Sequence, residues 1–570
     1  MIRFQSLLLC AALLILCTGR AQTVAPVAPP ATAPPDSTQA LVPIDTYIEG
    51  AWNELTRSMA DCHSLVDPKV KTAPVLYLPK DLPMPKDVAT LAAKCGVRVE
   101  RLPARIQHFG QVRRGEIATP GLLYLPNPYV VPGGRFNEMY GWDSYFIMLG
   151  LLRDGRVNLA HGMVNNFFFE IEHYGGILNA NRTYYFTRSQ PPFLSSMVLA
   201  VYSAEAARAT TPEERVQVRA WLVRAFRYEQ RDYSSWMSGI HRAGNTGLAR
   251  YFDVGEGPVP EMSDDSTYYP DVIRWLLAHP KRDPGYLVSL PDHPTPAETP
   301  KVDALSCDVA VSAVCAHAHV DGHWLTRSFY KGDRAMRESG FDTSFRFGPF
   351  SGSTQDFAGV DLNSLLYKYE LDMAHEARLL DKSSEAAQWK RRAARRRAAM
   401  NRYLWDAHRG LYMDYNFVTH RPSTYVYATT FYPLWAGEAS AAQAKAVEKN
   451  LKLFEHPGGL AMSTYNSGTQ WDLPFGWAPV TWLTIDGLYE EGDDADALRL
   501  TRRFSRTIGK NYERDRTIRE KYNVVSGSSQ VQVTAGYSGN QIGFGWTNAV
   551  YLEMQHLLAA ATPAVPSQQH

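Results

Sequence analysis

The chain has 570 residues, with 59 Lys and Arg against 58 Asp and Glu, so its formal net charge is +1. This balance argues against nucleic-acid or anionic-membrane partners, since both favour a basic excess. Aromatic residues make up 12% of the chain, including 31 Tyr and 13 Trp. Such side chains combine apolar area with a polar edge, which suits a wide cleft for a polar ligand as well as a large core.

The first 21 residues have the pattern of a secretory signal peptide. Arg3 supplies the positive start, Leu7 to Leu16 the apolar core, and Gly19-Arg20-Ala21 a small-residue cleavage site. The apolar run is too short to span a bilayer comfortably. We therefore expect a periplasmic or secreted protein that has no membrane contact once the signal is removed.

Four cysteines remain after this segment: Cys62, Cys95, Cys307 and Cys315. An exported compartment permits disulfides. The natural pairings are Cys62 with Cys95 and Cys307 with Cys315, although spacing alone decides neither.

Residues 22–44 form a Pro- and Ala-rich stretch with almost no charge, which predicts an extended linker. Residues 558–570 are expected to be a disordered tail, and residues 45–557 a single catalytic domain. Within this domain apolar residues recur mostly at helical spacing. The windows that suit amphipathic helices are Leu194 to Ala207, Glu213 to Gln230, Leu362 to Leu380, Ser383 to Leu404, Ala439 to Leu453 and Pro479 to Tyr489.

Local signals refine these helices. Thr211-Pro212 and the segment from Asp381 to Ser384 resemble helix caps. The basic run from Lys390 to Arg397 is interpreted as the exposed face of an amphipathic helix rather than as a site for an anionic partner. An all-α fold built as a ring of helical hairpins fits this pattern, although periodicity does not fix the topology.

The segment from His279 to Val302 is rich in proline and is expected to be a surface excursion. Shortly after it, four residues follow a C-x-H-x-H-x-x-x-H pattern: Cys315, His317, His319 and His323. This matches no standard zinc spacing. We interpret them as ordinary loop and helix residues and expect no metal.

Carboxylates lie among aromatic, Arg and amide residues in three distant segments: Pro132 to Phe146, Arg337 to Phe345 and Gln470 to Pro479. A fourth, Ile518 to Val524, adds a Glu within a charged turn. Carbohydrate chemistry needs this mixture, because aromatic faces stack on sugar rings, Arg and amides hold hydroxyls, and paired carboxyls move protons.

The segments PGGRFNEMYGWDSYF and QWDLPFGWAPV resemble the two signature motifs of the trehalases of glycoside hydrolase family 37. Further similar segments are NANRTYYFTRSQPPF, VPEM, SGFD, LWDAHRGLYMDYN, EKYNV and GFGWTN. The resemblance covers roughly residues 45 to 555. It implies an (α/α)6 barrel without metal or organic cofactor, which hydrolyses α,α-trehalose to two glucose molecules with inversion.

The resemblance assigns the general acid to Asp342 and the general base to Glu520. An inverting pair stands about 6.5–9.5 Å apart, leaving room for a water. Aromatic neighbours in sequence, Phe341, Phe345 and Phe347, favour a protonated Asp342 by desolvation.

The base segment is rich in cations, which favour the ionised carboxylate that a base requires. The cations that flank Glu520 are Arg514, Arg516, Arg519 and Lys521.

The resemblance also implies the residues that bind the substrate. Groups matching positions that hold glucose hydroxyls are Arg135, Asn179, Arg188 and Gln190. Pocket-lining aromatics are Phe136, Tyr140, Trp142 and Trp471, for which core packing is the alternative. Carboxylates expected to accept from hydroxyls are Asp143 and Asp472, and Glu261 lies in the matching VPEM segment.

Four positions depart from the family pattern: Val259 for an Arg, Gly536 for a Glu, Phe341 for a Trp and Phe475 for an Asn. Two alternatives to a trehalase therefore stay open, an inverting hydrolase of another α-glucoside and an inactive sugar-binding protein. Retention of both Asp342 and Glu520 argues against the second. A disaccharide is the expected partner, and we expect a monomer.

Overall fold

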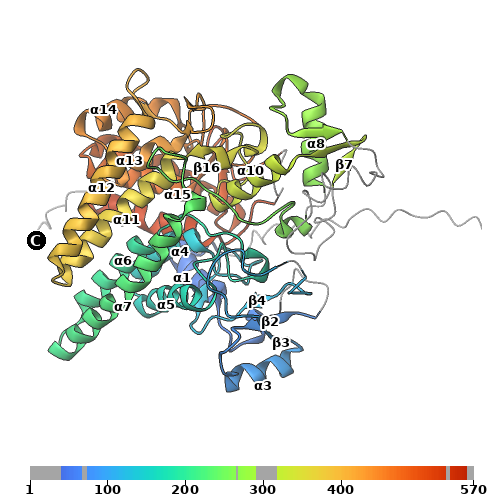
Figure 1. The fold of residues 1–570 in the computed structure, drawn as a ribbon. Helices are drawn as coiled ribbons and strands as arrows, with labels where there is room; N and C mark the ends of the chain where they lie inside the picture. The colour runs from blue at the N-terminus through green and yellow to red at the C-terminus, as the bar shows by residue number, and fades with distance from the viewer. Residues whose placement is uncertain are drawn as a thin grey trace, which may run out of the picture. The chain divides into compact units, whose positions relative to one another are not determined.

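Helices make up most of the secondary structure in the computed structural model of the chain (Figure 1). The structure describes residues 40–66, 73–113, 115–264, 267–289, 318–533 and 539–561. Contacts between residues group positions 42–570 into one compact unit, and the fold described below is that of this unit. Its longer helices are α1 (Ile44–Leu55), α3 (Lys86–Cys95), α4 (Gly141–Arg153), α5 (Val157–His173), α6 (Leu194–Arg208), α7 (Pro212–Trp236), α8 (Tyr268–Ala278), α10 (Arg327–Glu338), α11 (Val360–Leu379), α12 (Ser383–Tyr403), α14 (Ala441–Lys449), α15 (Ala478–Glu490), α16 (Asp494–Asp515) and α17 (Gly545–Ala560).

The helices pack in a regular succession. α4 contacts α17 and α6, α11 contacts α6 and α13 (Tyr432–Trp435), and α15 contacts α13 and α17. Four of these helices also pack against the helix that follows them in sequence, in the pairs α4 with α5, α6 with α7, α11 with α12 and α15 with α16. Most residues of α4, α15 and α17 are buried, as expected for helices that are apolar around most of their circumference.

All six sequence windows predicted to be helical contain helices, namely α6, α7, α11, α12, α14 and α15. Thr211 caps α7 as predicted, in a reciprocal capping box with Glu214. The second predicted cap is different. Lys382 occupies the N-cap of α12 without a side-chain cap bond, and Asp381 instead pairs with Arg219 at 2.9 Å.

The chain is not purely helical, because short strands interrupt the loops. β2 (Val75–Leu78) runs parallel to both β3 (Arg98–Arg101) and β4 (Leu122–Leu123), and α3 connects β2 to β3 (Figure 1). All four residues of β2 are buried, so its sequence lacks the alternation that marks a half-exposed strand.

The remaining short elements frame the loops between helices. They are α2 (Cys62–Leu65), β1 (Thr56–Arg57), β5 (Tyr129–Val130), β6 (Leu287–Ser289), β7 (His319–Val320), β8 (His323–Leu325), β9 (Phe357–Ala358), β10 (Trp405–Asp406), β11 (Leu411–Tyr412), β12 (Tyr415–Asn416), β13 (Arg421–Pro422), β14 (Glu455–His456), β15 (Gly459–Leu460), β16 (Phe475–Trp477) and β17 (Lys521–Asn523).

A disulfide joins Cys62 to Cys95 and so links α2 to the end of α3. This confirms the first predicted pairing. The second, between Cys307 and Cys315, lies outside the described residues, as does His317 of the metal-like pattern. His319 of that pattern stacks on the Trp324 ring.

The ends of the helical unit lie close to the predicted boundaries. α1 begins at Ile44, and α17 continues to Ala560, past the predicted start of the tail at residue 558. The signal peptide and nearly all of the predicted linker are outside the described residues. In the part of the chain that is described, no helix combines the length and the apolar character needed to cross a bilayer.

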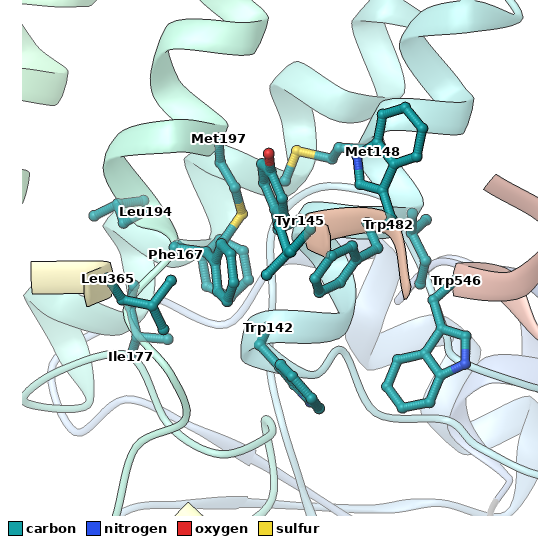
Figure 2. Packing of buried hydrophobic residues seen from close by; sticks show 14 of the residues in the cluster. Trp142, Tyr145, Met148, Phe167, Ile177, Leu194, Met197, Leu365, Trp482 and Trp546 are labelled. Carbon is teal, nitrogen blue, oxygen red and sulfur yellow. The ribbon is translucent and has the colours of Figure 1, made fainter. Parts of the chain in front are cut away.

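Two hydrophobic clusters fill the interior. In the larger one, Trp142 and Tyr145 of α4 lie in the same core as Trp482 of α15 and Trp546 of α17 (Figure 2). The smaller one, here named the insert cluster, gathers side chains of α8, α10, β8 and the loop after α10. Its buried members are Val259, Tyr268, Tyr269, Val272, Ile273, Leu276, Tyr286, Trp324, Leu325, Phe329, Tyr330, Phe345 and Phe350.

Candidate active site

The predicted acid, Asp342, lies in the loop that follows α10. This loop approaches the larger core so closely that a Cβ on Gly340 would lie 2.9 Å from the Trp142 indole. Gly340 also has a positive φ of 77°, which only glycine adopts at no steric cost. Gly340 therefore fixes the path by which the chain presents Asp342 beside Trp142.

Two backbone contacts connect the acid loop with the second signature segment. The side-chain amide of Gln470 donates to the backbone carbonyl of Asp342. The backbone N–H of Trp471 donates to the backbone carbonyl of Thr343 at 3.1 Å. Segments that are far apart in sequence are thus joined at the carboxyl that the sequence predicts to be catalytic.

The environment of Asp342 favours its protonated form. Burial raises the pKa of Asp342 to about 7, and the nearby Arg337 guanidinium opposes that rise. The Nη1 of Arg337 lies 3.7 Å from Oδ2 of Asp342. Since 35% of the Asp342 side chain is still exposed, the carboxyl is accessible to a ligand.

Arg337 is a site residue that our sequence reasoning missed. Asp333 accepts from its Nε at 3.2 Å and its Nη2 at 3.3 Å, which aims the guanidinium at the acid loop. The available signal was the spacing of four residues between Asp333 and Arg337 in α10, which places both on one helix face.

A pH dependence follows from the environment of Asp342. We expect kcat/KM for the sugar substrate to fall as the pH rises through about 7, because the pKa of Asp342 is raised to about 7 and the acid loses its proton there. Initial rates measured between about pH 3 and 9 check this. A basic limb that stays near pH 4 would contradict the assignment of Asp342 as the acid.

The predicted base, Glu520, immediately precedes β17 and is 2% exposed. Its N–H donates to the carbonyl of Gln541 at 3.0 Å, and its carbonyl accepts from Nε1 of Trp546 at 3.3 Å. Its Oε2 accepts from Nζ of Lys521 at 3.0 Å. The backbone and the carboxylate are therefore both held in place.

The cations that flank Glu520 in sequence do not all act as predicted. Lys521 pairs with Glu520, whereas Arg514 and Arg519 pair with Asp515, at 2.7 and 3.4 Å. Asp515, which lies between Arg514 and Arg516 in the sequence, pairs with both Arg514 and Arg519 in place of Glu520.

Asp143 connects the acid and the base. It lies in the first turn of α4 and is 5% exposed. Burial raises the pKa of Asp143 well above its usual range, and the negative charges of Glu520 and Asp342 raise it further. The Asp143 carboxyl is therefore within electrostatic range of the two segments that carry Glu520 and Asp342.

Arg188 and its partners form the polar part of the site. Arg188, which is 1% exposed, donates through Nη2 to Glu261 and, at 3.4 Å, to Asn179, and its Nη1 lies 3.4 Å from Asp253. Its guanidinium also lies over the Tyr185 ring. Oε2 of Glu261 has no hydrogen-bond partner among the described residues.

The predicted aromatic residues differ in their exposure. Trp142 and Trp471 are each 2% exposed, and their rings lie 5.9 Å apart in a cluster where Trp471 stacks on Trp477 at 3.8 Å. Phe136 and Tyr140 are half-buried and meet edge to face. The indoles therefore form the wall of the site, and the two half-buried rings have more surface left for a ligand.

Two further predicted residues lie beside these rings. Arg135 is exposed and lies over the Phe136 ring at 4.9 Å. Gln190 is 7% exposed, and its Oε1 accepts from the backbone N–H of Trp142 at 3.0 Å, which fixes the start of α4.

Asp472 is engaged in a way that the sequence did not predict. We expected it to accept from a sugar hydroxyl. Its side chain is 0% exposed, and its oxygens accept from the Phe345 N–H at 2.8 Å and from the hydroxyls of Ser467, Thr469 and Tyr425 at 2.6, 3.1 and 2.8 Å. Asp472 therefore anchors the acid loop to the second signature segment.

The departures from the family pattern have different surroundings. Val259 is fully buried in the insert cluster, Phe475 is buried in β16, and Phe341 packs edge to face on Trp142 and Trp471. Gly536 lies outside the described residues.

A mostly helical frame whose loops bring buried carboxyls, a clamped Arg, amides and indoles together is typical of a glycosidase. The profile of the Trehalase family matches residues 47–271 and 322–559 of this chain. The chain belongs to the trehalase family. The match omits residues 272–321, which contain the predicted excursion.

Individual relatives agree with this assignment to the trehalase family. The cytosolic neutral trehalase of Saccharomyces cerevisiae is 36% identical over 560 residues, covering 88% of this chain and 69% of that protein. That of Kluyveromyces lactis is 36% identical, covering 86% and 63%. This chain therefore spans about two thirds of the length of these relatives. The solved neutral trehalase of S. cerevisiae has a TM-score of 0.69 and 32% identity, covering 90% of this chain and 94% of that one.

Proposed function

We propose that this chain hydrolyses α,α-trehalose to two glucose molecules with inversion, using Asp342 as the general acid and Glu520 as the general base. The observation that carries the proposal is the contrast between the two carboxyls. Asp342 has a pKa raised to about 7 by burial, while the carboxylate of Glu520 is paired with a lysine ammonium 3.0 Å away. Inverting hydrolysis requires one protonated and one ionised carboxyl.

In this mechanism Asp342 gives its proton to the glycosidic oxygen as the bond from that oxygen to the anomeric carbon breaks. Glu520 takes a proton from a water that attacks the same carbon from the opposite face of the ring. One glucose leaves with its configuration retained and the other is released inverted. Arg188, Asn179 and Glu261 would hold hydroxyls, since each offers donors or acceptors with limited freedom.

The decisive experiment is NMR of the purified protein with trehalose during the first turnovers. We expect one α- and one β-glucose per trehalose, because inversion changes only one ring. Two α-glucose molecules would contradict the inverting mechanism, and absence of glucose release would contradict the enzymatic function.

A different α-glucoside is the second candidate substrate. Val259 motivates it, because this buried valine stands where the resembled family has a charged donor. A panel of α-linked disaccharides tests it. Faster turnover of another member than of trehalose would favour this alternative.

We further propose that the helices form an (α/α)6 barrel. The succession of contacts from α4 through α6, α11, α13, α15 and α17 back to α4 supports it, since an inner ring of six helices would give this closed order. An experimental structure in which α17 and α4 are apart would contradict it.

We propose that residues 1–21 are a cleaved signal, that residues 22–44 are a linker before a catalytic domain over residues 45–557, and that the protein is exported. The disulfide between Cys62 and Cys95 supports this, because disulfides persist in oxidising compartments. Mass spectrometry of the protein from cell fractions tests it. A cytoplasmic protein that keeps residues 1–21 would contradict the proposal.

A further inference from the structure

Lys521 is a lysine in an unusual position. It is 0% exposed, and its Nζ lies 3.0 Å from Oε2 of Glu520, which is itself 2% exposed. Lysine is almost never fully buried unless it is paired, because removing an ammonium from water carries a large cost. The proposed mechanism assigns this residue no role.

The surrounding backbone fixes where Lys521 lies. β17 pairs antiparallel with β16 so that Lys521 is opposite Trp477, and Nζ lies 5.1 Å from the Trp477 ring centroid. Asn540 binds the lysine backbone on both sides, accepting from its N–H at 3.2 Å and donating to its carbonyl at 2.9 Å. The ammonium therefore has little freedom to leave the carboxylate.

The charges around Lys521 come from three of the four segments singled out in the sequence. Burial lowers the pKa of Lys521, whereas the negative charges of Glu520 and Asp342 raise it and the Arg135 guanidinium lowers it. Glu520 and Asp342 also act on Asp143, and Asp342 is in turn affected by the charges of Arg337, Glu261 and Arg188. Lys521 therefore lies within electrostatic reach of the proposed acid as well as in contact with the proposed base.

We propose that Lys521 is a positioning residue of the hydrolytic reaction, which keeps a positive charge beside the Glu520 carboxyl and holds its Oε2 in a fixed place. This inference rests on the proposed function. Two carboxyls sharing a buried site tend to retain a proton between them, because like charges disfavour ionisation. A fixed positive charge beside one of them selects that one as the base and leaves the proton on Asp342.

The test compares pH profiles of kcat/KM for trehalose. In Lys521→Met we expect the acid limb to move up by about 1–3 pH units, since an opposite charge at this range depresses a carboxyl pKa by that much. Lys521→Arg, which keeps the charge, is expected to return the limb towards its wild-type position. The matched control is Lys510→Met, at an exposed position of α16, which should leave the profile unchanged.

An acid limb at the wild-type pH in Lys521→Met, with wild-type kcat, would overturn the proposal. A general loss of activity without a shift of the limb would also overturn it, since a merely structural role predicts that result.

Thermal unfolding at pH 8 gives a second measurement that does not depend on activity. Glu520→Gln/Lys521→Met is expected to melt at a higher temperature than Lys521→Met, because the single variant leaves a buried carboxylate without its partner. Equal melting temperatures would overturn the pairing. If the wild-type protein releases no glucose, the proposed function fails, whereas the comparison of melting temperatures still decides whether the two side chains act as a pair.

Discussion

Replacing Asp342 by Asn is expected to lower kcat for trehalose by about 10²–10⁴-fold, the usual contribution of a general acid. The amide has nearly the same shape and cannot give a proton to the glycosidic oxygen. The Gln470 amide binds the backbone carbonyl of Asp342, not its carboxyl, so the loop should keep its conformation. Steady-state kinetics and a thermal melt of the same preparation check both expectations.

A second substrate distinguishes the loss of the general acid in Asp342→Asn from a general loss of function. α-D-Glucosyl fluoride has a leaving group that needs little protonation, so Asp342→Asn should recover much of its rate on this compound. Asp494→Asn, at an exposed position on α16, is the matched control and should remain at wild-type activity. Activity of Asp342→Asn on trehalose within a few-fold of wild type would refute the assignment.

Replacing Glu520 by Gln should also lower kcat by about 10²–10⁴-fold, and here the fluoride should give no recovery. Every inverting substrate needs the attacking water to lose a proton, whatever its leaving group. The contrast between the two variants on α-D-glucosyl fluoride therefore assigns acid and base independently of absolute rates. Glu513→Gln, at an exposed position of α16, is the control. Equal recovery of both variants would contradict the roles proposed here.

Most helices could be predicted from the sequence because the apolar spacing that favours a helix is a local property of the chain. Apolar spacing predicted α6, α11, α12 and α15 almost to their ends, and α7 as far as Gln230 although that helix ends at Trp236. A helix cap was visible at Thr211. β2 was not predicted, since its four buried residues carry no alternation. We interpreted the basic run from Lys390 to Arg397 in α12 as an exposed helix face. Arg396 in this run is instead only 3% exposed and binds Glu370 of α11.

The sequence motifs singled out carboxyls for the candidate site, whose roles stay predictions, but not the contacts that support them. The motifs singled out Asp342, Glu520 and Asp143. In the structure the negative charges of Glu520 and Asp342 raise the pKa of Asp143. The anchoring role of Asp472 depends on donors from Phe345 and Tyr425, which are far away in sequence. Arg337 was missed because its aim at Asp342 depends on how the chain turns at Gly340. Such contacts are set by tertiary packing, and the four-residue spacing of Asp333 and Arg337 indicates a shared helix face but not what that face meets.

The insert cluster has a consequence for how this enzyme would lose activity. Phe345, three residues after Asp342, packs edge to face on Trp275 of α8, most of which belongs to the stretch that the family match omits. The loop that carries Asp342 is thus supported from two sides, by α8 through Phe345 and by the larger core through Phe341, whereas Glu520 is bound to Trp546 of α17. Gentle heating or limited proteolysis that loosens α8 should therefore silence hydrolysis while most of the protein is still folded.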